Sequence, residues 1–272
     1  MKYQSEFLGE FLGTLILVLF GCGSVAVTVL LNAHQGLLQI ALVWGIGVCL
    51  AIYATRHLSC AHLNPAVTLA MVASKRMKIE KVPVYILAQF LGAIVAGLLI
   101  YAAFSPTIAA YELSHQIVRG SPESSQVAKM FGEYYHLPGQ PAVVSMPLAA
   151  VMEAIGTFIL VLMIFSLTEG CNLGRPDDNL APVFIGLTVT SVICLVGPLT
   201  QAGLNPARDL GPRLVSWLFG WGAASFPDSS GGFFWVYILA PIIGGQLAGL
   251  FFTKVLEPQM HRPREACDCG SR

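Results

Sequence analysis

The chain has 272 residues, of which 55% are hydrophobic and only 11% are charged, and its formal net charge is zero. Soluble domains usually carry about 25% charged residues, so this composition excludes an ordinary soluble protein. The balanced charge gives no indication of a nucleic-acid or acidic partner. Three of the seven cysteines, Cys22, Cys49 and Cys194, lie in apolar stretches, so no disulfide framework is predicted. No cluster of His, Glu and Cys has zinc-ligand spacing, and we expect neither a metal nor another cofactor.

Six apolar stretches have about the length that a membrane-spanning helix requires. In chain order they are Phe11–Leu31, Leu37–Ala54, Val84–Phe104, Leu148–Leu167, Ala181–Val196 and Phe233–Phe252. The first stretch is too long for the apolar region of a signal peptide, so we expect it to remain as a span. If the N-terminus is cytoplasmic, most Lys and Arg residues fall on the cytoplasmic side, as the positive-inside rule requires. The sequence therefore predicts an all-α multi-pass membrane protein with both termini in the cytoplasm.

The chain contains an internal duplication. EFLGT at 10–14 is echoed by EAIGT at 153–157, and LGAIVAG at 91–97 by IGGQLAG at 243–249. Each copy holds three spans, so the second copy starts on the opposite membrane face and is inverted. Inverted repeats interrupted at matching positions indicate a substrate path between them. The predicted divisions are a first repeat at 1–104, an extracellular connecting loop at 105–146, a second repeat at 147–255 and a cytoplasmic tail at 256–272.

The triplet Asn-Pro-Ala occurs once in each copy, as Asn64, Pro65, Ala66 and as Asn205, Pro206, Ala207. Asn is a favoured helix N-cap and Pro is favoured at the first helical position. Each triplet therefore predicts a helix start, with half-helices at 65–73 and 206–219, the first about 14 Å long. Because the copies are inverted, the two N-termini would meet near the membrane midplane, each with about half a positive charge and a free Asn NH2 donor. The alternative is a pair of ordinary caps on re-entrant loops without a transport role.

These residues resemble the aquaporin superfamily, the major intrinsic proteins. The resemblance covers about residues 5–255 and includes EFLGT, AHLNPAVT, VRGS at 118–121, GPLT at 197–200 and GLNPARDLGPR. It is closest to bacterial glycerol facilitators, which have an acidic residue directly after the pore arginine, here Asp209, and a basic residue four positions later, here Arg213. The resemblance implies six membrane helices plus two re-entrant half-helices in an inverted 3+3 repeat. It also implies a homotetramer in the bacterial inner membrane that is a channel and not an enzyme.

The same resemblance places a selectivity filter on Trp44, Ile193, Ala202 and Arg208. Water-selective members have His where this chain has Ile193, so a wider, more amphipathic opening is implied. Trp44 would offer an apolar wall and Arg208 fixed donors, a pairing that suits an alditol. Glycerol facilitators usually have an aromatic residue at the position of Ala202. The missing ring either widens the filter for urea, larger polyols or neutral metalloid hydroxides, or Gln201 fills the gap. Backbone carbonyls predicted to accept from the solute belong to Cys60, Ala61, His62, Leu63, Gln201, Gly203 and Leu204.

Four further polar positions are interpreted as supports or lining of the pore. Glu10 and Glu153, which are related by the repeat, are expected to accept backbone N–H bonds from the re-entrant loops; a proton relay is the alternative. Asp209 is expected to pair within its loop, and His62 to brace its loop or line the pore entrance.

The predicted function is a passive channel for glycerol and related small neutral solutes, with water, that excludes ions and protons. A water-preferring pore, an ion-coupled transporter and an intramembrane hydrolase that uses Glu10 or His62 are the alternatives. The sequence assigns no role to Cys267 and Cys269.

Overall fold

The computed structural model describes residues 3–226, 228 and 231–260; Cys267 and Cys269 lie outside them. The described residues form helices and no strand. Six of these helical segments are long and apolar enough to cross a membrane. They are α1 (Gln4–Leu31), α2 (Leu37–Ser59), η1–α4 (Ile79–Lys81 and Val82–Ser114), α6 (Met146–Thr168), α7 (Ala181–Thr200), and the continuous run α9 (Gly232–Phe234), η5 (Trp235–Leu239), α10 (Ala240–Phe251), η6 (Phe252–Leu256) and α11 (Glu257–Met260). The prediction of an all-α protein with six spans is confirmed.

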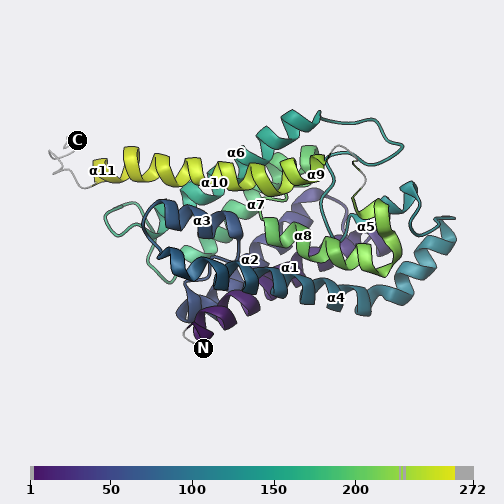
Figure 1. Ribbon diagram of the computed structural model, residues 1–272, viewed down its shortest axis with the longest axis horizontal. Coiled ribbons are helices and arrows are strands. Elements are labelled where there is room, and N and C mark those ends of the chain that lie inside the picture. Colours follow the sequence, from purple (N-terminus) through teal and green to yellow (C-terminus); the bar gives the residue numbers. More distant parts are fainter. Residues whose placement is uncertain (1–2, 227, 229–230, 261–272) are drawn as a thin grey trace, which may run out of the picture.

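The two halves of the chain pack in matching ways around two short helices, α3 (Pro65–Ala73) and α8 (Pro206–Ser216). Helix α1 packs on α2 and α4, and its counterpart α6 packs on α7 and α10. Helices α2 and α7 join the halves. The short helices are exchanged, because α3 packs on α10 and α8 packs on α4 (Figure 1). Each half therefore completes the other around the molecular centre.

Glycines allow the closest helix contacts. A Cβ at Gly92 would collide with the backbone oxygen of Phe11, and a Cβ at Gly244 would collide with that of Ala154, its counterpart in the second half. Small residues let membrane helices approach closely and pack by dispersion, where lipid removes the hydrophobic driving force. These positions tie α4 to α1 and α10 to α6, and so hold the frame around the short helices.

Three boundaries differ from the divisions read from the sequence. Helix α4 continues past residue 104 to Ser114, and the last helical run continues past residue 255 to Met260. The second short helix, α8, ends at Ser216 and is followed by η3 (Trp217–Trp221), in which the helical backbone is broken at Phe219 and at Gly220, with φ of 103°. The connecting segment also does not simply lie on the surface. Its residues from Met130 to Tyr134 are buried.

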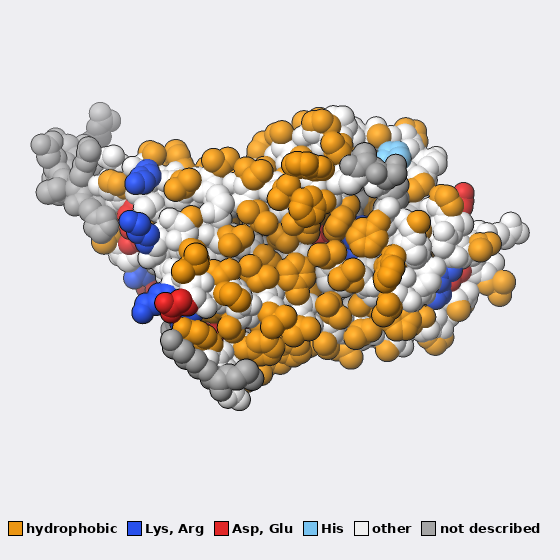
Figure 2. Space-filling model, viewed as in Figure 1, with side chains coloured by type: hydrophobic (Ala, Val, Ile, Leu, Met, Phe, Trp, Pro, Cys, Tyr) orange, Lys and Arg blue, Asp and Glu red, His pale blue; other side chains and the backbone are white. Residues whose placement is uncertain are grey.

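The outer surface fits a lipid environment. Figure 2 shows hydrophobic side chains across the middle of the molecule, with charged side chains gathered toward its two ends. Leu38, Ile46, Leu187 and Leu247 are among the large apolar side chains that are more than two-fifths exposed. Helices α1 and α11 reach the same end of the molecule in Figure 1. The chain is a multi-pass membrane protein whose apolar belt faces the bilayer.

Candidate functional site

Both Asn-Pro-Ala triplets begin helices. Asn64 has extended backbone angles and its side-chain oxygen accepts a bond from Ala66 N at 2.8 Å. Asn205 does the same, accepting from Ala207 N at 3.0 Å and from Arg208 N at 3.2 Å. Proline at the first helical position costs nothing there, because its missing N–H would have had no partner within the helix. The triplets thus start α3 and α8 inside the molecule.

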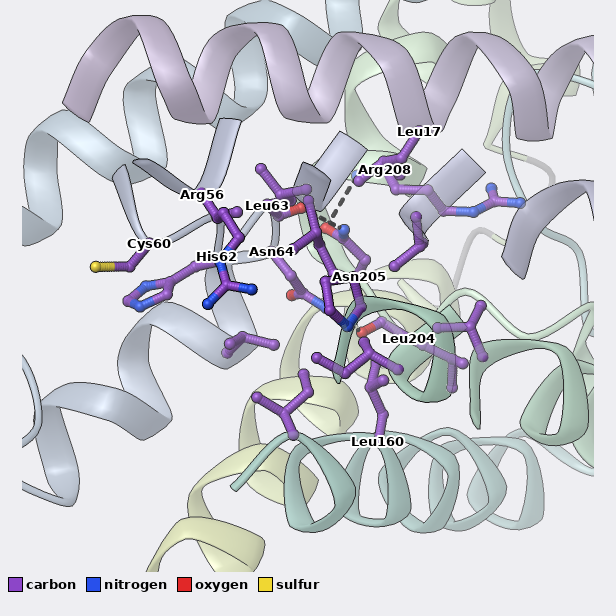
Figure 3. A pocket seen from close by; sticks show the side chains of 18 of the residues that line it. Leu17, Arg56, Cys60, His62, Leu63, Asn64, Leu160, Leu204, Asn205 and Arg208 are labelled. Carbon is purple, nitrogen blue, oxygen red and sulfur yellow. Dashed lines mark hydrogen bonds between the residues drawn. The ribbon is translucent and has the colours of Figure 1, made fainter. Parts of the chain in front are cut away.

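The two caps are also bonded across the molecular centre (Figure 3). The amide nitrogen of Asn64 donates to the Leu204 carbonyl at 2.9 Å, and that of Asn205 donates to the Leu63 carbonyl at 2.8 Å. The sequence interpretation left both amide groups free to donate, which is wrong for one hydrogen of each. An amide nitrogen carries two hydrogens, so one per Asn is left for a solute.

The loops before the two helices share an unusual backbone conformation. Cys60, Ala61 and Leu63 have φ of 70°, 53° and 55°, and the residues 141 positions later repeat the pattern. Those residues are Gln201, Ala202 and Leu204, with φ of 68°, 61° and 55°. Non-glycine residues in this region cost about 1–3 kcal/mol each when strained, and they persist only where the surroundings hold them. The loops must therefore be supported from outside.

Glu10 supports the first loop. Its carboxylate accepts bonds from His62 N at 2.9 Å and Leu63 N at 2.7 Å, and from the Ser59 hydroxyl at 2.8 Å. The amide of Gln89 donates to it as well, at 2.7 Å. The carboxylate is fully buried, and two of its bonds come from backbone N–H groups of the loop, so the geometry is that of a loop support.

Glu153 makes the equivalent bonds in the second half. It accepts from Gly203 N at 2.9 Å, from Leu204 N at 2.8 Å and from the Thr200 hydroxyl. The hydroxyl of Tyr237 donates to the Thr200 carbonyl at 2.8 Å and secures the same turn. Two buried carboxylates thus hold the two strained loops through equivalent hydrogen bonds.

A cavity of about 460 Å³ runs along these loops. It reaches from Arg56, Arg76 and Asp178 at one end to Arg208 at the other, and passes both cap asparagines. The residues predicted for the filter all line it: Trp44, Ile193, Ala202 and Arg208. Of the residues whose carbonyls were predicted to face a solute, Cys60, Ala61, His62, Leu63, Gly203 and Leu204 line it, and Gln201 does not.

Trp44 forms the apolar side and Arg208 the polar side of the cavity's far end. The Arg208 guanidinium lies 4.1 Å from the centre of the Trp44 ring. Both side chains are about 95% buried, and Gly21 leaves room for the ring, because a Cβ there would collide with it. An indole face beside a guanidinium with fixed N–H donors matches a molecule that has both carbon and hydroxyl edges.

Asp209 and Arg213 form a buried ion pair one turn apart on α8, with Arg213 Nε donating to Asp209 Oδ2 at 3.0 Å. The pair also binds the connecting segment, because Glu133 N donates to Asp209 Oδ1 at 2.7 Å. Gln201 turns toward the same segment: its side-chain oxygen accepts from Tyr134 N at 3.1 Å. The side chain of Gln201 therefore does not fill the space beside Ala202 in the cavity.

Glu133 is the residue that the sequence analysis missed. Its carboxylate forms an ion pair with the guanidinium of Arg208, and both side chains are only 5% exposed. The one signal in the sequence is an acidic residue within an aromatic run, FGEYYH at 131–136. Nothing in that run indicates a contact with the second Asn-Pro-Ala motif, because its pairing depends on how the connecting segment folds.

Comparison with known proteins agrees with this geometry. The family model described as "Major intrinsic protein" matches residues 1–252. The chain belongs to the major intrinsic protein family. The structure is similar to the X-ray structure of the aquaglyceroporin from Plasmodium falciparum, with a TM-score of 0.81 at 28% sequence identity, covering 95% of this chain and 98% of that one.

Bacterial relatives of this major intrinsic protein carry solute names. It is 39% identical to the "Glycerol uptake facilitator protein" of Haemophilus influenzae, over 98% of this chain and 97% of the relative. It is 42% identical to the "Propanediol uptake facilitator PduF" of Salmonella typhimurium, over 86% and 87%. Members of the family that share these names are passive channels, so the chain is not an enzyme.

Proposed function

We propose that this major intrinsic protein is a passive channel for glycerol and related small neutral solutes, together with water, and that it excludes ions and protons. The observation that carries the proposal is one cavity that passes both helix-capping asparagines and ends at Trp44 and Arg208. The names of the bacterial relatives support glycerol and propanediol as solutes.

The cavity offers a solute different chemistry on its different sides. Carbon atoms pass along Trp44, Ile193 and Leu17, and hydroxyl groups exchange water for Arg208 and the free amide hydrogens of the asparagines. Backbone carbonyls of the two strained loops accept hydrogen bonds from the hydroxyl groups of the solute. Because conduction requires a solute to leave as easily as it enters, several weak partners in a row serve better than one strong site.

Exclusion of cations and protons rests on the junction of α3 and α8. Each helix N-terminus has about half a positive charge, and the two face one another through Asn64 and Asn205. Positive ends of half-helices and an arginine are established barriers in aquaporin-type pores. Donors from both asparagines also orient a passing water as an acceptor, which interrupts a chain of proton-transferring hydrogen bonds.

Stopped-flow light scattering on proteoliposomes tests the proposal. We expect glycerol permeability far above that of protein-free liposomes, alongside water permeability. Fast water flux with glycerol flux at the protein-free level would instead identify a water-preferring pore. Accumulation of glycerol against its gradient, driven by protons or sodium, would identify an ion-coupled transporter and overturn the passive channel.

We further propose that both termini face the cytoplasm of a bacterium, in its inner membrane, and that four copies assemble as a homotetramer. The distribution of Lys and Arg supports the orientation, and the family resemblance supports the tetramer. Light scattering coupled to size exclusion in detergent measures the protein mass directly, and a mass near that of one chain would contradict the tetramer.

A further inference from the structure

The ion pair between Arg208 and Glu133 is nearly dry. Both side chains are 5% exposed, and the guanidinium contacts both the Glu133 carboxylate and the Trp44 ring. A guanidinium that is buried without a partner leaves an uncompensated charge, which is far costlier than the intact pair. Glu133 therefore supplies charge that Arg208 needs at this depth.

The position of Glu133 is fixed by the buried ion pair of Asp209 and Arg213 on α8. Asp209 accepts from Glu133 N at 2.7 Å, and Arg213 donates to the Glu133 carbonyl. Arg213 also donates to the Ser225 carbonyl at 2.6 Å. A Cβ at Gly132 would lie 2.8 Å from Arg213 Nε, so glycine lets the segment pass directly over the guanidinium. The connecting segment is thus clamped at the residue that reaches the pore arginine.

The pair lies where two cavities approach each other. Arg208 lines the cavity of about 460 Å³ described above, whereas Glu133 lines a second cavity of about 400 Å³. That second cavity is bounded by the connecting segment, including Tyr135, and by Phe233 and Tyr237 at the start of the last span. Arg213 and Asp228 line the second cavity as well, and Glu133 links the lining of that cavity to the arginine that lines the first.

We propose that Glu133 is a specificity-determining residue of this channel: its carboxylate cancels the charge of Arg208, so that the arginine offers hydrogen-bond donors to neutral solutes without holding small anions. Arg213 does not compete with Arg208 for the Glu133 carboxylate, because Arg213 is already paired with the buried carboxylate of Asp209. The inference rests on the proposed function, because it gives Glu133 a role in choosing the solute. Cation exclusion is then left to the meeting helix N-termini.

The test replaces Glu133 by Gln, which keeps the shape and removes the charge. Glycerol permeability is measured in proteoliposomes with equal nitrate on both sides, and again with equal lactobionate, a disaccharide acid that is too bulky to reach a filter sized for linear alditols. We expect nitrate to leave the wild type unchanged. In Glu133→Gln, nitrate should bind at Arg208 and halve the glycerol permeability when its concentration equals its dissociation constant. Glu133→Asp, which keeps the charge, should restore indifference to nitrate.

Glu112→Gln is the matched control. Glu112 is another buried carboxylate paired with an arginine, Arg119 at 2.7 Å, and neither residue lines either cavity. This variant should show no sensitivity to nitrate. Nitrate sensitivity in Glu112→Gln equal to that in Glu133→Gln would overturn the proposal, as would a Glu133→Gln variant that ignores nitrate.

A second readout does not depend on transport. Nitrate should raise the melting temperature of Glu133→Gln in detergent and leave that of the wild type unchanged, because a ligand that binds only the folded state stabilises it. If the wild type conducts no glycerol, the proposed function fails while this readout still tests the pair. If Glu133→Gln does not fold, Glu133→Ser is measured in the same two assays, and its indifference to nitrate would contradict the proposal.

Discussion

Asn64 and Asn205 each donate a hydrogen bond to the carbonyl that directly precedes the other, at 2.9 Å and 2.8 Å. Each side chain also caps its own helix. The junction of the two half-helices is therefore a closed pair, in which either asparagine holds the position of the other's loop. This reciprocal bonding joins the loops of the two halves at the point where a solute passes, so that the position of each loop depends on the other.

This reciprocity predicts coupled stabilities. Asn64→Ala or Asn205→Ala removes a cap, worth about 1 kcal/mol, and a crossing bond, worth about 1 kcal/mol. Each single variant should thus lower the free energy of unfolding by about 2 kcal/mol. Loss of one asparagine already loosens the acceptor of the other, so the double variant should fall short of the sum by at least about 0.5 kcal/mol. Reversible unfolding in mixed micelles measures all three values.

The matched control for this coupling is Asn172. Its amide also bridges backbone groups, donating to the Ser166 carbonyl at 2.7 Å and accepting from Gly174 N at 3.1 Å, and Asn172 itself does not line the cavity. Asn172→Ala combined with Asn205→Ala should be additive. Additive behaviour of Asn64→Ala with Asn205→Ala as well would show that the two caps act independently.

Much of this arrangement was predictable because it is written in local patterns. Apolar stretches of membrane length predict the six spans, and Asn-Pro before an apolar run favours a helix start. The duplication turns two local signals into one long-range expectation, that the half-helices meet. Glu133 has no such support. Glu133 lies in the irregular connecting segment and its partner Arg208 lies in the second repeat. No repeat, periodicity or capping pattern links that segment to the filter.

The crossing bonds of Asn64 and Asn205 were missed for a different reason. A cap motif specifies what the side-chain oxygen does on its own helix, but it says nothing about the nitrogen. The nitrogen's partner is set by how closely the two inverted loops approach, which depends on the packing of α3 on α10 and α8 on α4. Packing distances of this kind are decided by glycines and side-chain volumes across the whole frame.

The small side chain of Ala202 predicts a generous size limit. It lines the cavity beside Arg208, and Gln201 is held by Tyr134 and does not occupy the space. We expect the wild type to conduct erythritol and ribitol as well as glycerol. Ala202→Phe should reduce ribitol permeability about tenfold or more, because forcing a longer solute past a ring costs at least about 1.4 kcal/mol in the barrier. Glycerol permeability should fall less.

Stopped-flow measurements with the alditol series give the cut-off directly, and Ala202→Ser, which adds a single oxygen, should keep the wild-type profile. A wild type that conducts glycerol but excludes erythritol would show that another group narrows the filter, and the size-limit prediction would be wrong.

Ile193 predicts which chemistry the filter prefers. It lines the cavity with Trp44 and is 5% exposed, so carbon atoms of a solute meet an apolar side chain on that side. Ile193→His replaces this contact with a polar ring. Burial of an apolar side chain of this size is worth about 1.5–3 kcal/mol, and loss of part of that contact should lower glycerol permeability by about tenfold while water flux persists.

The conservative variant Ile193→Val distinguishes the loss of an apolar contact from the effect of any substitution at this position. It keeps an apolar wall and should retain most of the glycerol flux. Parallel measurement of water and glycerol in the same proteoliposomes gives the ratio. An unchanged glycerol-to-water ratio in Ile193→His would show that this side of the cavity does not select the solute.

Cys60 provides a test of orientation through the pore itself. Its side chain is exposed, lines the cavity and lies at the same end as His62 and Arg56 (Figure 3). If the termini are cytoplasmic, this end opens to the cytoplasm. A membrane-impermeant methanethiosulfonate should then block most glycerol flux in inside-out vesicles and leave right-side-out vesicles unaffected, because the attached group occupies the cavity.

The variant Cys60→Ser should be resistant to the reagent from both sides. The exposed thiol of Cys171 lies in the loop between α6 and α7 and does not line the cavity, so its labelling in Cys60→Ser provides the internal control. Block of the wild type from the right-side-out face alone would reverse the proposed orientation.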